Sequence, residues 1–191
     1  INGIPYNDAE SLGTYWVDLP DFASSVENLQ VQRGVGTSTN GSSAFGASIN
    51  ILTDLISKTP YFENSNSIGS YNTLKNTFKF STGILNDYFE FSGRLSKIDS
   101  DGYIDRSSSD LKSYFLQVNY KKENTLIKAL SFGGHEITYQ AYNGIDRETL
   151  ESDRTYNPSG MYIDQSGNIQ FYENEVDNYK QDHYQLHWSQ I

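Results

Sequence analysis

The stretch LKNTFKFSTGILNDYFEFSGRLS, residues 74–96, decides the fold class. In residues 74–81, and again in residues 89–96, bulky apolar side chains alternate with polar or charged ones. This period of two is typical of a β-strand that keeps only one apolar face. Asn86-Asp87 lies between the two runs and favours a tight hairpin turn. The stretch therefore predicts two antiparallel strands joined by a short turn.

The same alternation recurs further along the chain. It is clear in residues 114–120, less regular in residues 126–132 and weakest in residues 179–191. A poor first strand is expected near residues 67–71. In all, about six strands are expected, which is a common size for a sheet but too few to close a large barrel.

Short and long connections alternate between these runs. Asn86-Asp87 and residues 122–124 are short, whereas residues 99–110 form a longer polar link. A stretch of roughly 40 residues, far beyond the usual loop length, follows the fourth run. Bacterial outer-membrane barrels have tight turns at one rim and long loops at the other. A soluble sandwich has no reason to sort its loops in this way, so the pattern favours a barrel.

The composition is compatible with a barrel and excludes other classes. The chain of 191 residues has 15 Tyr, 10 Phe and no Cys, and its formal net charge is −10. Aromatic girdles around a polar lumen would combine many aromatic residues with a mean hydropathy of −0.61. The lack of Cys excludes a disulfide framework, and the negative charge disfavours nucleic acid as a partner. On composition alone, a soluble β protein rich in Tyr remains an alternative.

The first part of the chain, residues 1–58, follows a different pattern. Short strands are expected from residue 29 to 33 and from residue 47 to 52, on either side of a Gly-rich stretch. Closely spaced glycines indicate tight turns and close backbone approaches. We therefore expect a small domain at residues 1–58 and longer strands at residues 59–191, with a long loop at about residues 141–178.

Several motifs resemble those of one known family. Residues 31–41, VQRGVGTSTNG, continue through Phe45-Gly46 and Ile49-Asn50-Ile51, and together resemble the end of the plug domain in TonB-dependent outer-membrane receptors. The opening INGIP, residues 1–5, is similar to an earlier plug strand. Further motifs resemble the Bacteroidetes branch of the family: SDGYIDR at residues 100–106, FGGHEITYQA at 132–141, RTYNP at 154–158 and DNYKQDHY at 177–184.

This resemblance implies a mainly β fold with two parts. The first is the C-terminal part of a small α/β plug domain, and the second is a partial transmembrane antiparallel β-barrel. A closed barrel of the family has about 22 strands around a plugged lumen, so about six strands amount to a fragment. The periplasmic segment that touches TonB and most of the barrel are then expected to lie outside this chain.

The resemblance also implies a function. Receptors of this family sit in the outer membrane of Gram-negative cells and import scarce, bulky solutes such as ferric siderophores, haem or cobalamin. TonB, the solute and outer-membrane lipid are the implied partners, and a surface lipoprotein is a further candidate. The alternatives are a non-transport surface β protein, such as an adhesin or glycan-binding module, and a passive porin. The Gly-rich plug motif separates the first hypothesis from the porin.

Candidate site residues follow from the same likeness. Tyr15-Trp16 corresponds to a plug loop that points toward the extracellular cavity, where aromatic rings can stack on a chelate. Packing inside the plug is the alternative for both rings. Arg33 matches a plug arginine of the family, and Glu90 is expected to face the lumen, so the two are a candidate plug–barrel contact. Lys128 shares an otherwise apolar face, expected to meet lipid, and would have to snorkel at a rim.

No pattern points to catalysis or to a metal. His183 and His187 lie four residues apart, which separates them by about 13 Å along a strand. Asp99, Asp101 and Asp105 surround a glycine that is misplaced for a calcium loop, and no closing Glu follows. No nucleophile–base pair stands out. We expect a protein that is not an enzyme and that carries neither a bound metal nor a cofactor.

Overall fold

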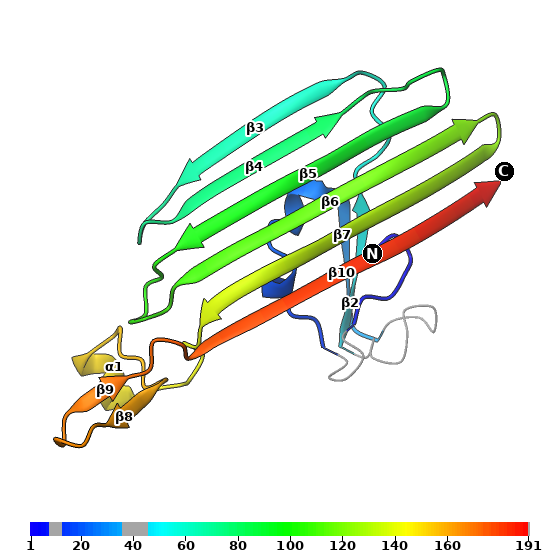
Figure 1. The fold of residues 1–191 in the computed structure, drawn as a ribbon. Coiled ribbons are helices and arrows are strands. Elements are labelled where there is room, and N and C mark those ends of the chain that lie inside the picture. The colour runs from blue at the N-terminus through cyan, green and yellow to red at the C-terminus, as the bar shows by residue number, and fades with distance from the viewer. Residues whose placement is uncertain (8–12, 36–45, 191) are drawn as a thin grey trace.

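The computed structural model describes residues 1–7, 13–35 and 46–190. Its largest element is a six-stranded antiparallel sheet in the order β10-β7-β6-β5-β4-β3 (Figure 1). Chain neighbours are also sheet neighbours, so the sheet is a meander. The mainly β expectation is confirmed. The strands are β3 (Tyr61–Ile68), β4 (Leu74–Ser81), β5 (Phe89–Ser100), β6 (Ser109–Lys122), β7 (Thr125–Tyr139) and β10 (Val176–Gln190).

β4, β5 and β6 form where the sequence alternates, and the turns form where the backbone can reverse. Asn86 and Asp87 both adopt positive φ, 49° and 64°, as the two central residues of a type I′ turn must. Glu123, between β6 and β7, has φ 49°. These two connections lie at one end of the sheet, which we call the turn end. The connections 69–73, 101–108 and 140–175 lie at the other end, the loop end.

Two expected boundaries are wrong. The poor strand expected near residues 67–71 is a turn for most of its length, because Tyr71 and Asn72 have positive φ. The first strand of the sheet, β3, lies earlier, at Tyr61–Ile68, where polar residues hide the alternation. The long loop also ends sooner than expected, since β10 already begins at Val176 and pairs with Tyr139.

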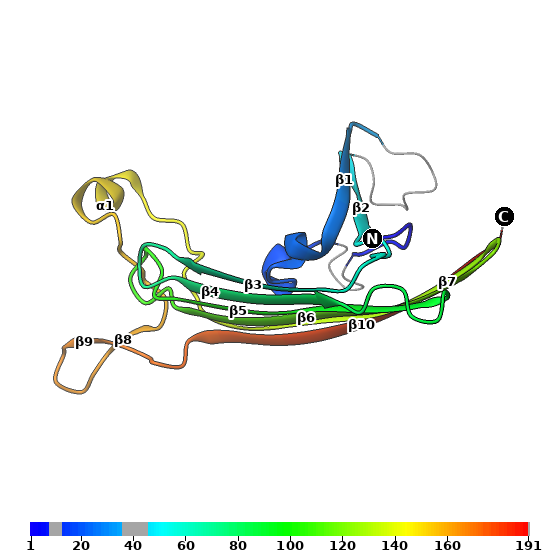
Figure 2. The ribbon, with the colours of Figure 1, turned by 90° about the horizontal axis from the view of Figure 1, so that it is seen from above.

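We call residues 1–58 the N-terminal unit, and its described residues lie on one side of the sheet (Figure 2). The unit contains two short 3₁₀ helices, η1 (Trp16–Asp18) and η2 (Phe22–Ser25), followed by the hairpin of β1 (Val26–Arg33) and β2 (Ala47–Thr53). In Figure 2 the hairpin rises away from the sheet while η1 and η2 sit close to it. The Gly-rich motif from Gly36 to Phe45 lies outside the described residues.

The loop between β7 and β10 has structure of its own. It carries the helix α1 (Arg147–Ser152) and the small hairpin of β8 (Met161–Ile163) and β9 (Ile169–Phe171). Asp146 caps α1 by accepting the Thr149 backbone N–H at 2.9 Å. The Arg106 guanidinium ties the loop to residues 101–108, since it lies 3.5 Å from the centre of the Phe171 ring and donates to the Asn157 carbonyl.

The two faces of the sheet differ in chemistry. The inner face, under the N-terminal unit, is mostly polar and buried, and the outer face carries exposed apolar side chains. Leu95, on a central strand, is 53% exposed on the outer face, whereas its neighbour Arg94 is 1% exposed on the inner face. The buried polar residues of the inner face are Thr77, Ser81, Glu90, Ser92, Arg94, Ser96, Ser113, Gln117, Asn119 and Glu136.

The face expected for residues 126–132 is wrong. Phe132 lies opposite Phe115 on the inner face, and Lys128 shares that face. Lys128 does not snorkel toward a rim, because its Nζ donates to Thr53 Oγ1 at 2.8 Å and to the Asp54 carbonyl at 3.2 Å. Alternation gives the period of a strand but not which face is covered. Here the inner face holds one apolar patch of its own.

Within the described residues, β3 and β10 each pair with one neighbour only, and the sheet does not close on itself. None of the helices in the described ranges is long and apolar enough to cross a membrane.

Candidate functional site

The contact between the N-terminal unit and the inner face is centred on Asp21. This residue stands between Pro20 and η2 in the left-handed region, at φ 54° and ψ 22°. Asp is one of the few residues besides Gly that tolerates this region. The conformation turns the carboxylate into the sheet, where it is 3% exposed. It accepts hydrogen bonds from three inner-face side chains: Lys75 Nζ at 2.5 Å, Thr77 Oγ1 at 2.7 Å and Ser96 Oγ at 2.6 Å.

Arg94 completes this cluster from the middle of β5. Its Nη1 lies 3.4 Å from Asp21 Oδ2 and donates to Ser113 Oγ at 3.0 Å, and its Nε donates to Ser25 Oγ at 2.7 Å. A buried guanidinium needs both a counter-charge and hydrogen-bond acceptors, and Asp21, Ser25 and Ser113 supply them. We call Asp21, Arg94 and Lys75 the docking cluster.

The hydrogen bonds set the charge of Asp21. Burial by itself raises the pKa of this carboxyl, but hydrogen bonds from Lys75, Ser24, Ser96 and Thr77 outweigh burial and hold the pKa at about 2. Asp21 is therefore ionised at neutral pH.

A second polar contact lies where the N-terminal unit leaves the inner face. Asp54 Oδ2 is 2.8 Å from Lys79 Nζ. The Asp54 carbonyl accepts hydrogen bonds from Gln117 Nε2 and Lys128 Nζ, both at 3.2 Å. Lys79 also donates to the Ser24 carbonyl at 3.0 Å, so it joins η2 to this second contact.

An apolar cluster completes the interface, in which Ile1, Leu19, Phe22 and Ile51 of the N-terminal unit join Phe115, Leu130 and Phe132 of the sheet. Phe22 packs on Phe132 with a ring-centre distance of 5.2 Å and on Phe115 at 6.3 Å. All three rings are buried. Close by, a Cβ added to Gly134 would overlap the Asp18 carbonyl oxygen, so the glycine lets the backbone of η1 lie directly on β7.

A third contact lies on β10. Gln181 Nε2 donates to Tyr6 Oη at 2.6 Å and to the Asp18 carbonyl at 3.1 Å. His183 lies between two rings, with centres 4.9 Å from those of both Phe132 and Tyr6. The interface as a whole is therefore mostly hydrogen-bonded and charged. In such an interface, a shift that separates the partners of a buried pair costs much free energy. The intact interface nevertheless contributes less net binding energy than an apolar one of equal size.

The structure does not form the expected pair of Arg33 and Glu90. Arg33 ends β1 on the exposed side of the N-terminal unit. Glu90 does face inward, as expected, but its carboxylate accepts hydrogen bonds from Ser81 Oγ and Asn119 Nδ2, both at 2.6 Å and both within the sheet. The signs of the expected contact are reversed, because the acid, Asp21, comes from the N-terminal unit and the arginine, Arg94, from the sheet.

Tyr15 and Trp16 are 55% and 51% exposed, so neither is packed inside the N-terminal unit. Trp16 borders a cavity of about 440 Å³ whose walls also include Ile1, Pro5, Tyr6 and Asn50, but Tyr15 does not. A ligand contact by these two rings stays a prediction.

In residues 1–7, 13–35 and 46–190, no group of three or more His, Cys, Asp or Glu side chains is placed to hold a metal ion. His183 is stacked on Phe132, and the His187 ring contacts Gln185 Oε1 at 3.2 Å. Asp101 accepts a hydrogen bond from Asn72 at 2.6 Å. The contacts described above form a docking interface between the N-terminal unit and the sheet. No protein-family model matches the chain, and no curated protein matches it.

Proposed function

We propose that this chain is part of an outer-membrane importer energised by TonB, which takes up an iron chelate, such as a siderophore or haem, or cobalamin. In this proposal the N-terminal unit is the end of a plug, and the six-stranded sheet is a section of a barrel of about 22 strands. TonB would be contacted through a segment outside this chain.

The chemistry of the two faces is the observation that carries the proposal. A soluble antiparallel sheet with one covered face places apolar side chains under the cover and polar ones in water. This sheet does the reverse, as a membrane barrel does when its outside meets lipid and its lumen is polar. Exposed side chains of the outer face include Phe78, Phe80, Phe89, Phe91, Leu95, Leu116, Val118, Leu186 and Trp188.

Aromatic side chains gather at the turn end. The Phe89 and Tyr120 ring centres are 5.0 Å apart, and Tyr88 lies 6.2 Å from Tyr120. Lys122 Nζ sits over the Tyr88 ring at 5.4 Å. Amphipathic rings beside a cation are typical of a membrane–water boundary. The long, structured loop 140–175 lies at the opposite end, where a barrel has its extracellular loops.

The docking cluster supports the same proposal. A plug must hold its place and then move when a solute is imported. Charged and hydrogen-bonded contacts suit that task, because water replaces them when they separate, whereas a large apolar interface would stay exposed. The solute and a surface lipoprotein would be met at the loop end.

Cell fractionation and uptake test the proposal. We expect the native full-length protein in the outer membrane, and we expect deletion of its gene to lower uptake of a radiolabelled ferric chelate or of cobalamin. An uncoupler should lower uptake in wild-type cells to the same level. A soluble native protein would refute the proposal and favour the adhesin or glycan-binding alternative. Uptake that resists the uncoupler would point to a passive pore.

A further inference from the structure

Two lysines stand directly opposite each other on the outer face near the loop end. Lys97 of β5 pairs with Lys112 of β6, and the next outward pair along these strands is Asp99 with Asp110. Like charges directly opposite in a sheet are destabilising. Exchanging Lys112 with Asp110 would turn both like-charge pairs into opposite-charge pairs. The observed arrangement therefore places two ammonium groups side by side, and each of them also contacts an aspartate of its own strand.

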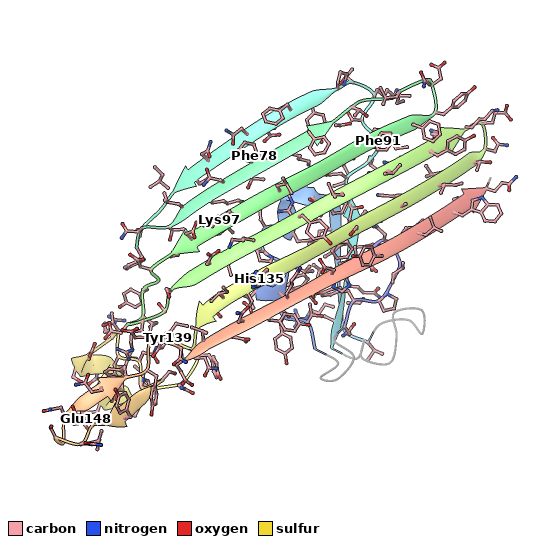
Figure 3. The ribbon with its side chains drawn as sticks, in the orientation of Figure 1. Phe78, Phe91, Lys97, His135, Tyr139 and Glu148 are labelled. Carbon is pink, nitrogen blue, oxygen red and sulfur yellow. The ribbon has the colours of Figure 1, made fainter. Side chains whose placement is uncertain are left out.

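The two lysines belong to a row of hydrogen-bond donors. Asn76 lies beside Lys97 on β4, and His135, whose Nε2 contacts Asn178 Oδ1 at 2.8 Å, lies beside Lys112 on β7. Figure 3 shows Lys97 and His135 nearer than Phe91 to the loop that carries Glu148. Lys180 extends the row to β10, where its Nζ lies 3.9 Å from Asp182. We call Asn76, Lys97, Lys112 and His135 the donor row.

An apolar row borders the donor row on the side of the turn end. Phe78, Leu95 and Tyr114 are side by side on the same face. Each lies two residues closer to the turn end than the donor-row residue of its own strand. Two residues along a strand correspond to about 7 Å. A ligand with an anionic group joined to apolar chains would meet both rows at once.

The lysines keep free donors. Lys97 Nζ is 3.0 Å from Asp99 and Lys112 Nζ is 3.5 Å from Asp110, and the two lysine side chains are 47% and 52% exposed. Exposed ion pairs of this kind are weak, and an ammonium group has three donors of which one carboxylate uses one. Each lysine therefore keeps donors for a phosphate oxygen while its contact with the carboxylate stays in place.

We propose that the donor row binds the phosphate of a lipid headgroup whose acyl chains cover the apolar outer face. This inference rests on the proposed function, because it requires the outer face to meet lipid. It adds a lipid site of defined chemistry at the loop end. A phosphate between Lys97 and Lys112 places a negative charge beside both ammonium groups, and the apolar row next to it favours a lipid over free phosphate.

The test uses the native full-length protein in nanodiscs of phosphatidylcholine mixed with phosphatidic acid. Native mass spectrometry measures how far phosphatidic acid is enriched on the protein. We expect enrichment on the wild type and a loss on the order of tenfold in the Lys97→Gln/Lys112→Gln variant. The Asp99→Asn/Asp110→Asn variant should raise the enrichment, because it removes the carboxylates that share the lysines. Arg147→Gln/Arg154→Gln removes the same charge from the loop and should change nothing.

Equal enrichment in the wild type and the double-lysine variant overturns the inference, as does complete displacement of phosphatidic acid by inorganic phosphate. All four lysine and aspartate side chains are at least one-third exposed, so these variants should fold, and an unchanged circular dichroism spectrum checks that. Fractionation separates the two proposals. A soluble native protein refutes both proposals. If the protein is in the outer membrane but Lys97→Gln/Lys112→Gln leaves the enrichment of phosphatidic acid unchanged, only the lipid site is refuted.

Discussion

Replacing Asp21 with Asn isolates the charge of the docking cluster. Asn is nearly the same shape as Asp and is at least as tolerant of the left-handed backbone that Asp21 adopts at φ 54°. Thr77 and Ser96 can rotate their hydroxyl groups to meet an amide. The change therefore removes one negative charge and little else.

The expected cost follows from the burial of Arg94. Its side chain is 1% exposed, and Asp21, at 3.4 Å, is its ion-pair partner. Removing one partner of a buried pair costs about 3–5 kcal/mol, because the other charge stays buried without compensation. Lys75 is 33% exposed and recovers solvation from water, so it adds little. At about 3 kcal/mol, the undocked fraction of the N-terminal unit rises by about a hundredfold.

Hydrogen exchange of residues 16–25 in the full-length protein measures this change. We expect faster exchange in Asp21→Asn and no change in Glu27→Gln, which removes one charge from the exposed part of β1. The double variant Asp21→Asn/Arg94→Met should exchange more slowly than Asp21→Asn, since it no longer buries an unpaired charge. Equal protection in Asp21→Asn and Glu27→Gln would refute the reasoning.

Three further predictions concern the pH dependence of Asp21 and two other contacts. Because the pKa of Asp21 is held at about 2 in the folded protein, its contribution is complete above about pH 4 and is lost as the pH falls toward 2; acid titration of the same exchange should show no loss through this group between pH 7 and 5. Gly134→Ala should displace η1, because the new Cβ overlaps the Asp18 carbonyl, and a change in Trp16 fluorescence would report it. Arg106→Gln should speed proteolysis within residues 140–175, since it removes the contacts to Phe171 and Asn157 that anchor the loop; an unchanged cleavage rate would count against that anchor.

The sequence predicts β4 and β5 well because these strands alternate regularly. Residues 74–81 and 89–96 lie in β4 and β5 with the expected faces, and the turn at Asn86-Asp87 has the expected backbone. Alternation fails where a strand is polar on both sides, as in β3, whose middle reads Glu-Asn-Ser-Asn-Ser. Such a strand is held by backbone hydrogen bonds to its neighbour, and its side chains show no alternation of apolar and polar residues.

The candidate site is harder to predict because it depends on contacts across the fold. Glu90 and Arg94 lie on the same face of β5, four residues apart, and the sequence alone does not say which of them the N-terminal unit reaches. The position of Asp21 decides this, and a lone Asp after a proline gives no signal of a long-range pair. The prediction for Lys128 is wrong for the same reason, because the sequence does not show which face of β7 the N-terminal unit covers.

The balance of contacts at the inner face limits how tightly the N-terminal unit can be held. Phe22 is the one buried aromatic side chain that the described part of this unit inserts between Phe115 and Phe132. Burying such a side chain contributes about 2–3 kcal/mol. The docking cluster adds little net stability, because its groups would be solvated by water in the undocked state. A shift that parts Asp21 from Arg94, however, leaves a buried charge unpaired, and its cost in free energy exceeds the contribution from burying Phe22. A displacement that parts Asp21 from Arg94 while both stay buried is therefore disfavoured, and the N-terminal unit can leave the sheet only along a path that lets water reach both charges.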